Sequence, residues 1–201
     1  KTVNEGSAVV HGLVGALDVD HGDVLGYSTV SKVAGFILNK DGSYSIDPSN
    51  KAYDHLAAGE HVTLTIPVTA TDNHGATSVP QNLIITINGS NDTAVITSTV
   101  LKLTEDTHTS ATIHLGITDP DTAEAHFNAA TLSGAHGSAT LKADGTLSYQ
   151  LDNKAAQHLN AGETITDTIK VTSADGTTHD VSITINGTND IPVIDAITAQ
   201  S

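Results

Sequence analysis

An internal repeat of about 100 residues constrains the fold of this chain more than any other feature. The segment LIITINGSND, which ends at Asp92, recurs as VSITINGTND, which ends at Asp190. Two earlier landmarks recur in the same order: NKDGSYSID returns as KADGTLSYQLD, and HLAAGE returns as HLNAGE. A shared order of landmarks at this spacing predicts two copies of one module rather than a single large domain.

Each copy has the pattern of short strands separated by turns. Residues 62–70 alternate apolar side chains with threonines, the period of two that is typical of a strand with one buried face. Asp41-Gly42 and Asp144-Gly145 stand between short alternating runs, which is a strong hairpin signal. About seven strands in a hundred residues, with Gly and Asp turns, predict an all-β fold: two tandem immunoglobulin-like or cadherin-like β-sandwich domains arranged end to end.

Two local expectations accompany this fold. In the second copy Asp167 takes the place that Leu64 has in the first, so we expect one end of that buried row to be exposed to solvent. The only helical feature that we expect is a short turn around residues 50–58.

The repeat also predicts the domain boundaries. The first sandwich is expected at residues 1–92, a short linker at 93–99 and the second sandwich at 100–190. The tail NDIPVIDAITAQS repeats the linker sequence NDTAVITS, so residues 191–201 are expected to be a linker and the start of a truncated next repeat. We therefore interpret both ends as cuts through a longer array, in which each repeat contacts its neighbours.

The charge of the chain limits its partners. Acidic residues outnumber basic ones by 23 to 8, the net charge is −15, and there is no arginine. This composition argues against nucleic acid and anionic membranes as partners. No stretch approaches about 18 consecutive apolar residues, so direct insertion into a membrane is not expected. Self-repulsion on this scale favours bound cations. There is no cysteine, so disulfides and thiolate zinc sites are excluded, and Ca²⁺ is the alternative means of stabilising a secreted module.

Two Asp-x-Asp pairs are the strongest candidate metal ligands. In an extended segment residues i and i+2 point the same way, so Asp18 and Asp20, like Asp119 and Asp121, present two carboxylates to one side. Carboxylate oxygens are ligands that Ca²⁺ prefers, and paired carboxylates repel each other without a cation. The alternative is that these aspartates only form solvated turns.

The motifs together resemble a known family. LDVDHGDVLGYS, the two DG hairpins, the AGE turns, VTATDNHG and the closing ITINGSND and ITINGTND are similar to the VCBS repeats and related cadherin-like repeats of giant bacterial RTX adhesins. The second copy departs from the pattern, because ITDPDTAEAHF lacks the Gly-Asp of DHGDVL and its Asp175-Gly176 turn is shorter. The resemblance implies a secreted, cell-surface protein exported by a type I system, whose repeats project a distal adhesive domain for attachment and biofilm formation.

The resemblance also implies calcium sites where consecutive repeats meet. For the central joint it implies Glu5, Glu60, Asn91 and Asp92 from the first copy and Asp119, Asp121 and Asp175 from the second, with Asn88 as a possible further ligand. The same mapping gives an N-terminal half-site of Asp18, Asp20 and Asp72. It gives a C-terminal half-site of Glu105, Glu163, Asn189 and Asp190. Only the central site is expected to be complete in this chain.

An enzymatic function is not expected. The eleven histidines form neither helical i, i+4 pairs nor clusters with cysteine, and no nucleophile elbow or phosphate-binding loop is present. The expected role is a calcium-rigidified, monomeric extender whose partners are neighbouring repeats, with the adhesive ligand bound by another domain. Two alternatives remain open: a sandwich that itself binds a glycan or host protein through exposed aromatic residues, and an accessory module of a secreted hydrolase.

Overall fold

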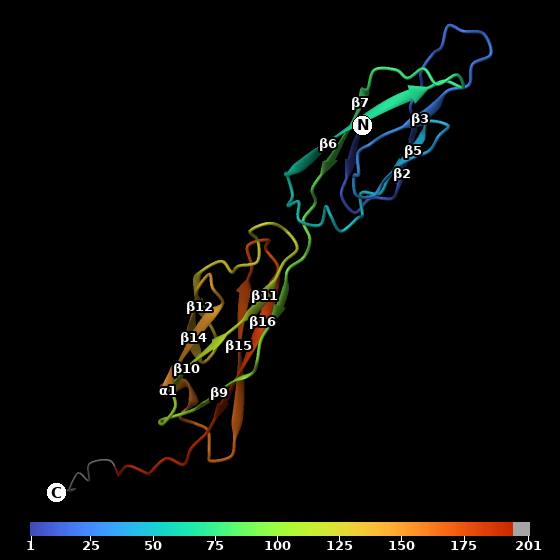
Figure 1. The fold of residues 1–201 in the computed structure, drawn as a ribbon. Coiled ribbons are helices and arrows are strands. Elements are labelled where there is room, and N and C mark those ends of the chain that lie inside the picture. The colour runs from blue at the N-terminus through green and yellow to red at the C-terminus, as the bar shows by residue number, and fades with distance from the viewer. Residues whose placement is uncertain (195–201) are drawn as a thin grey trace, which may run out of the picture. The chain divides into compact units, whose positions relative to one another are not determined.

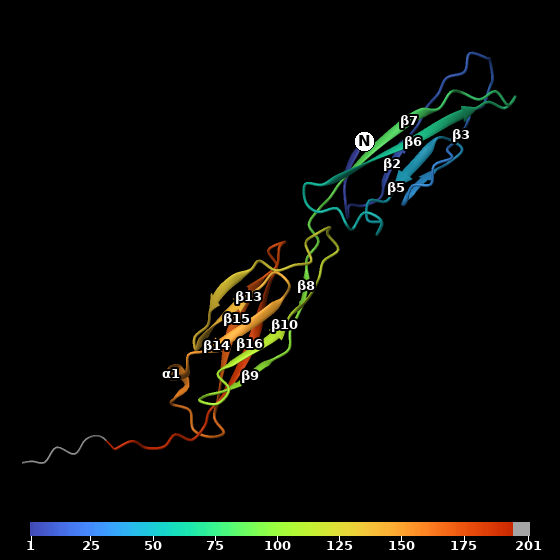
Figure 2. The same ribbon diagram turned by 60° about the vertical axis from the view of Figure 1, so that its left-hand side comes forward.

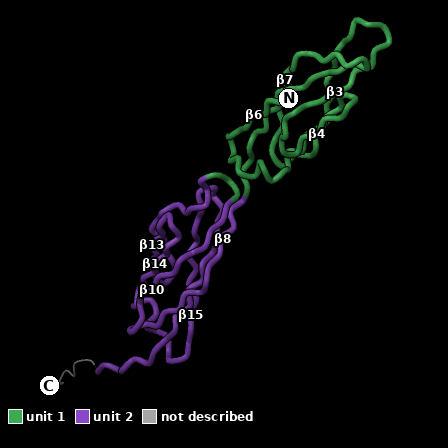
Figure 3. The backbone as a smooth tube through the Cα atoms, in the orientation of Figure 1, with its two compact units in different colours: residues 1–92, 120–122 green, residues 93–119, 123–201 purple. Residues whose placement is uncertain are grey.

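The computed structural model describes residues 1–194 and divides the chain into two compact units (Figures 1 and 3). Unit 1 contains Lys1–Asp92 together with the loop segment Pro120–Thr122. Unit 2 contains Thr93–Asp119 and the chain from Ala123 onward. The predicted all-β fold is confirmed, because β-strands form the framework of both units.

Unit 1 consists of two sheets. In the larger one β1 is parallel to β7, and the remaining pairs are antiparallel in the order β1-β7-β6-β3. The smaller sheet has the antiparallel order β2-β5-β4. Figure 2 shows the long antiparallel pair of β6 and β7. The strands are β1 (Thr2–Asn4), β2 (Val10–Leu13), β3 (Gly26–Ser28), β4 (Phe36–Leu38), β5 (Ser43–Ile46), β6 (His61–Thr71) and β7 (Gln81–Asn88).

Unit 2 repeats this plan and adds a short strand pair. Its sheets have the orders β15-β16-β9 and β10-β14-β13-β12, and β9 is parallel to β16 as β1 is to β7. A further antiparallel pair joins β8 to β11. The elements are β8 (Val95–Thr97), β9 (Leu101–Thr104), β10 (Ser110–His114), β11 (Gly116–Thr118), β12 (Ala130–Ser133), β13 (Gly137–Leu141), β14 (Thr146–Leu151), α1 (Asn153–Ala156), β15 (Thr164–Thr172) and β16 (Thr178–Asn186).

Each unit has its own aliphatic core. In β7 and β16 alternate residues point inward, so that Ile85 and Ile87 are buried in unit 1 and Ile183 and Ile185 in unit 2. The two clusters of buried residues have no member in common. The period of two that the sequence shows therefore serves two separate cores.

The helical turn occurs in both copies, in different forms. Residues 50–58 of unit 1 form consecutive turns, with the amide of Tyr53 bonded to the carbonyl of Asn50. The equivalent residues of unit 2 form α1, and the side chain of Asp152 caps it by accepting a hydrogen bond from the amide of Lys154.

The expectation for Asp167 was wrong. This side chain is only 3% exposed. Its carboxylate accepts hydrogen bonds from the Tyr149 hydroxyl (2.6 Å) and from the amides of Ala135 (2.9 Å) and His136 (2.9 Å). Burial is possible because these donors replace the water that a carboxylate would otherwise require.

Candidate metal centre

The loop after β11 gathers three carboxylates. Asp119, Asp121 and Glu124 each offer an oxygen atom, and these atoms lie within 4.8 Å of one another. Asp121 is buried, and the other two are partly buried. A turn lies between Asp121 and Glu124, and Ala123 within it has a left-handed φ of 65°. The predicted Asp119–Asp121 pair is thus extended by Glu124, which the sequence analysis missed.

Unit 1 places two further carboxylates beside Asp121. The amide of Asp92 donates a hydrogen bond to Oδ2 of Asp121 (2.8 Å). The neighbouring Thr122 donates from its amide (3.1 Å) and its hydroxyl (2.8 Å) to the carbonyl of His55. Glu5 follows β1 and is 8% exposed. Three of the residues expected at the central joint, Glu5, Asp92 and Asp121, are therefore found in unit 1.

Glu5 has the environment of a metal ligand. Its Oε2 accepts a hydrogen bond from the amide of Ser90 (3.1 Å), whereas its Oε1 is buried and has no hydrogen-bond partner among the described residues. Burial raises the pKa of Glu5; the Ser90 amide partly offsets this, and the charges of Asp92, Asp121 and Asp54 raise the pKa further. A buried carboxylate surrounded by like charges is costly without a cation.

Unit 2 repeats the glutamate arrangement. Glu105 follows β9 and is 0% exposed. Its Oε1 accepts a hydrogen bond from the amide of Thr188 (2.7 Å), and its Oε2 has no hydrogen-bond partner among residues 1–194. Asn189 and Asp190 are exposed beyond β16, and Nδ2 of Asn189 donates to the carbonyl of Asp190 (3.3 Å). Asn91 does the same with Asp92 in unit 1 (2.9 Å).

The glutamates of the two AGE turns, Glu60 and Glu163, accept hydrogen bonds from backbone amides of the same turns. Oε2 of Glu60 accepts a hydrogen bond from the amide of Ala57 (3.2 Å), and Oε2 of Glu163 accepts one from the amide of Asn160 (2.8 Å). This bond, with a second from the Asn160 side chain, lowers the pKa of Glu163. Both side chains are exposed, and neither belongs to the group formed by Asp119, Asp121 and Glu124.

A second acidic group lies in the loop before β3. Asp18, Asp20 and Asp23 offer oxygens within 4.8 Å of one another. The amide of Asp20 donates to Oδ1 of Asp18 (3.0 Å), and Oδ1 of Asp23 lies 3.2 Å from Nδ1 of His74. The predicted pair Asp18 and Asp20 is thus brought together, and Asp23 joins it.

The aspartates of the later turns accept hydrogen bonds from their own loops. The amides of Ala76 (2.9 Å) and His74 (2.8 Å) donate to Oδ1 of Asp72, and these bonds lower its pKa. The carboxylate of Asp175 accepts hydrogen bonds from the hydroxyls of Ser173 and Thr177 and from the amide of Ala94 (3.1 Å). Burial alone would raise the pKa of Asp175, but these bonds hold it well below its usual range.

The residues brought together offer the oxygen ligands that Ca²⁺ prefers and do not suit Zn²⁺. Every candidate ligand is an oxygen, and no histidine belongs to the group around Asp121. Ca²⁺ takes six to eight oxygen ligands, whereas Zn²⁺ prefers nitrogen and sulfur. The unpartnered buried oxygen of Glu5 would be satisfied by such an ion.

Comparison with known domains identifies the fold and the family of the second copy. Residues 91–187 match the family described as bacterial cadherin-like domain. Unit 2 is thus similar to bacterial cadherin-like domains. This likeness supports an extracellular, adhesion-type module, and the family is typically non-enzymatic and generally binds Ca²⁺. The predicted resemblance to cadherin-like repeats is confirmed.

Solved cadherin structures extend the likeness of fold to both copies. The chain is 18% identical to human CDH23 EC21-23, with a TM-score of 0.54 and coverage of 93% of this chain and 67% of that one. Human mucin-like protocadherin EC1-2 is 14% identical, with a TM-score of 0.53, and the match covers 94% of this chain and 95% of that one. Protocadherin gamma B2 domains 3-6 are 16% identical, with a TM-score of 0.53 and coverage of 92% of this chain. The match covers only 44% of that fragment, so the chain spans less than half of it. At these identities the likeness concerns the fold alone.

Two negative findings accompany these comparisons. No curated protein matches the sequence significantly. Within residues 1–194, no helix has the length and apolar character needed to cross a membrane.

Proposed function

We propose that this chain consists of calcium-rigidified extender repeats of a large secreted bacterial surface adhesin. The observation that carries the proposal is the buried glutamate that opens each unit. Among residues 1–194, Glu5 keeps one oxygen without a hydrogen-bond partner, beside the like charges of Asp92 and Asp121. Glu105 is also buried and has one oxygen without a partner among these residues, in a unit that matches the bacterial cadherin-like family. A bound Ca²⁺ would neutralise these charges and satisfy the buried oxygen.

The mechanism that we propose is a change in chain flexibility. Occupancy would hold the loop segment Pro120–Thr122 in unit 1 through Asp121, together with Glu5 and Asp92. The chain continues from this segment into unit 2, so a filled site would restrict the movement of one unit relative to the other. Asp119 and Glu124 would complete the ligand set from the same loop.

The cellular role follows from the same mechanism. Extracellular modules bind Ca²⁺ with dissociation constants of about 10⁻⁴ to 10⁻³ M, so such sites fill outside the cell and stay empty in the cytosol. Export through a type I system would therefore deliver a flexible chain that stiffens at the cell surface and projects a distal adhesive domain.

Calcium titration of the full chain tests the proposal. We expect Ca²⁺ at about 100 times its dissociation constant to stabilise the folded state by about 2.7 kcal/mol, measured as a rise in the thermal midpoint, and Mg²⁺ to do much less. Small-angle scattering should change from the profile of a flexible pair to that of a stiffer particle.

Two variants make the test specific. Asp121→Asn should lose most of the calcium response. Asp180→Asn makes the same change in charge at an exposed residue outside the acidic groups and should keep the response. A thermal midpoint that is unchanged by Ca²⁺, or equal losses in both variants, would contradict a calcium site at this group.

The glycan-binding alternative is disfavoured by the aromatic residues. Tyr44, Tyr53, Tyr149 and Phe127 are all buried, which leaves Tyr27 and Phe36 partly exposed. Two partly exposed aromatic side chains do not form the extended aromatic surface that glycan binding requires.

A further inference from the structure

Two positions near the buried glutamate carry opposite residues in the two repeats. The segment NKAYDHL of unit 1 aligns without a gap with NKAAQHL of unit 2, so Asp54 corresponds to Gln157. The residue that follows the buried glutamate changes in the other direction, from Gly6 in unit 1 to Asp106 in unit 2. Each repeat therefore has one carboxylate at this pair of positions.

In unit 2 the two positions are in contact. Oδ1 of Asp106 accepts hydrogen bonds from Nε2 of Gln157 (2.8 Å) and from Nδ2 of Asn153 (2.7 Å). Its Oδ2 accepts one from the hydroxyl of Thr188 (3.2 Å), whose amide donates to Glu105 (2.7 Å). The Asp106 carboxylate therefore lies beside the site of the buried glutamate, and the side chain of residue 157 reaches it.

Unit 1 has the same backbone arrangement at this place. Gly6 has a φ of 67°, close to the 62° of Asp106. The amide of Ser90 donates to Glu5 (3.1 Å), as the amide of Thr188 does to the glutamate of its own unit. The turn after NKA is closed in each repeat by the same backbone hydrogen bond, 3.0 Å long. Residue 54 of unit 1 therefore faces a place that lacks a side chain and that a carboxylate fills in unit 2.

Asp54 lies close to the acidic group of unit 1. It is partly buried, and the carbonyl of the next residue, His55, accepts hydrogen bonds from the amide (3.1 Å) and hydroxyl (2.8 Å) of the residue after Asp121. Burial raises the pKa of Glu5, and the charges of Asp92, Asp121 and Asp54 raise it further. Backbone geometry and charge thus agree on the position of Asp54.

We infer that Asp54 is a further calcium-binding residue of unit 1, and that Asp106 has the same role in unit 2 from the other position. The inference rests on the proposed calcium function. The affinity of a Ca²⁺ site depends on the number of charged ligands. Oε1 of Glu5, which is buried and has no hydrogen-bond partner among residues 1–194, independently indicates an ion at this place.

The alternative is a purely structural role for these aspartates. Asp106 joins the loop after β9 to α1 through Asn153 and Gln157, and aspartate tolerates a left-handed φ better than most residues. Such a role explains Asp106 in unit 2. It also predicts that removing the charge of Asp54 leaves calcium binding unchanged, so the calcium affinity of unit 1 distinguishes the two roles.

Nuclear magnetic resonance of the full isotope-labelled chain measures binding at this place. The Ser90 amide donates to Glu5, so its resonance reports on the occupancy of this site during a Ca²⁺ titration. Asp54→Gln introduces the residue of the other repeat, and we expect it to raise the dissociation constant about tenfold, because it removes a charge near a divalent ion. Asp180→Asn makes the same change in net charge at an exposed residue of β16 and should leave the constant nearly unchanged.

A double variant tests the equivalence of the two positions. Gly6→Asp combined with Asp54→Gln gives unit 1 the arrangement of unit 2 and should restore most of the lost affinity. The new side chain fits, because Gly6 shares the left-handed φ of Asp106 and a Cβ atom there would meet nothing within 4 Å. The recovered affinity would then come from a carboxylate at a different position of the chain.

The outcomes separate this inference from the proposed function. A native chain whose Ser90 resonance does not respond to Ca²⁺ would contradict the proposed function and the inference with it. A native response that Asp54→Gln leaves unchanged would overturn the inference alone. A double variant that binds no better than Asp54→Gln would overturn the equivalence of the two positions, whereas weakening followed by restoration supports it.

Discussion

Two equivalent core positions hold a polar pair in one repeat and an apolar pair in the other. Unit 2 buries Tyr149 and Asp167 in hydrogen-bond contact, and the corresponding residues of unit 1 are Ile46 and Leu64. Burial alone would raise the pKa of Asp167, but the hydrogen bonds from Tyr149, His136, Ala135 and Thr168 lower it. The carboxylate is therefore ionised at neutral pH and belongs to the core of unit 2.

Replacing Asp167 by the residue of the other repeat should be strongly destabilising. Asp167→Leu leaves the buried Tyr149 hydroxyl without its acceptor and removes the acceptor of the partly buried amide hydrogen bonds from Ala135, His136 and Thr168, so we expect a loss of about 3 kcal/mol in the free energy of unfolding of unit 2. Tyr149→Phe combined with Asp167→Leu removes one of these donors and should recover about 1 kcal/mol. Urea denaturation followed by circular dichroism measures both values; a neutral Asp167→Leu variant would show that the hydrogen bonds do not stabilise the unit.

Glu5→Gln should have opposite effects with and without calcium. A carboxyl group with a raised pKa in the folded state reduces stability above that pKa, because the unfolded chain ionises more readily. The metal-free variant should therefore be more stable than the native chain at neutral pH, and the difference should vanish as the pH falls below about 4.5 and Glu5 is protonated in both states.

With calcium bound, the native chain should be more stable than Glu5→Gln. Loss of one charged ligand that weakens binding tenfold reduces the stabilisation at saturating Ca²⁺ by about 1.4 kcal/mol. Thermal unfolding of both proteins across pH, in EDTA and in Ca²⁺, provides the measurement. A variant that is less stable than the native chain in EDTA at neutral pH would assign Glu5 a structural role only.

At the scale of elements, the strands were predictable because their pattern is local. The alternation in β6 and β7 and the Asp-Gly hairpins are visible in the sequence, and the structure confirms them. The Asp-x-Asp pairs were predictable for the same reason. Asp54 and Glu124 were missed because their approach to the acidic group depends on loop conformation. Asp167 was misjudged because its partner Tyr149 lies on another strand.

The tight Asp-Gly hairpin of unit 2 should tolerate no side chain at Gly145. This glycine has a φ of 87°, and a Cβ atom there would lie 2.6 Å from the carbonyl oxygen of Leu115. Gly162 has a similar φ of 90° with nothing within 4 Å, so it is the matched control for backbone strain alone. We expect Gly162→Ala to cost about 1 kcal/mol and Gly145→Ala at least twice that, by urea denaturation. Equal costs would mean that the hairpin adjusts to the extra atom.

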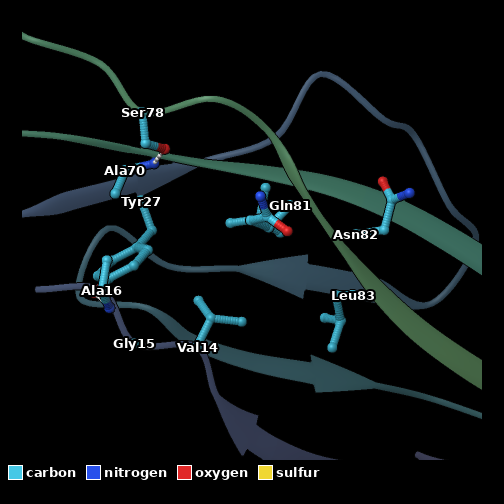
Figure 4. A pocket seen from close by; sticks show the side chains of 10 residues that line it. Val14, Gly15, Ala16, Tyr27, Ala70, Ser78, Gln81, Asn82 and Leu83 are labelled. Carbon is cyan, nitrogen blue, oxygen red and sulfur yellow. Dashed lines mark hydrogen bonds between the residues drawn. The ribbon is translucent and has the colours of Figure 1, made fainter.

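At the scale of the whole chain, the separate cores imply separate stabilities. Unit 2 buries Leu115 and Phe127 under β8, whereas unit 1 leaves Val14 and Tyr27 partly exposed around an apolar cavity of about 260 Å³ (Figure 4). Burial of apolar surface contributes about 25 cal/mol per Å², so unit 1 gains less stability from this part of its fold. We therefore expect two thermal transitions in EDTA, the first of them from unit 1.

Matched core substitutions assign these transitions. Ile85 of β7 and Ile183 of β16 occupy equivalent positions and are both fully buried. Replacing either by alanine should cost its own unit about 3 kcal/mol. Ile85→Ala should lower only the first midpoint and Ile183→Ala only the second in differential scanning calorimetry. If either substitution shifts both transitions equally in EDTA, the two cores unfold as one cooperative unit, and the prediction of separate stabilities is wrong.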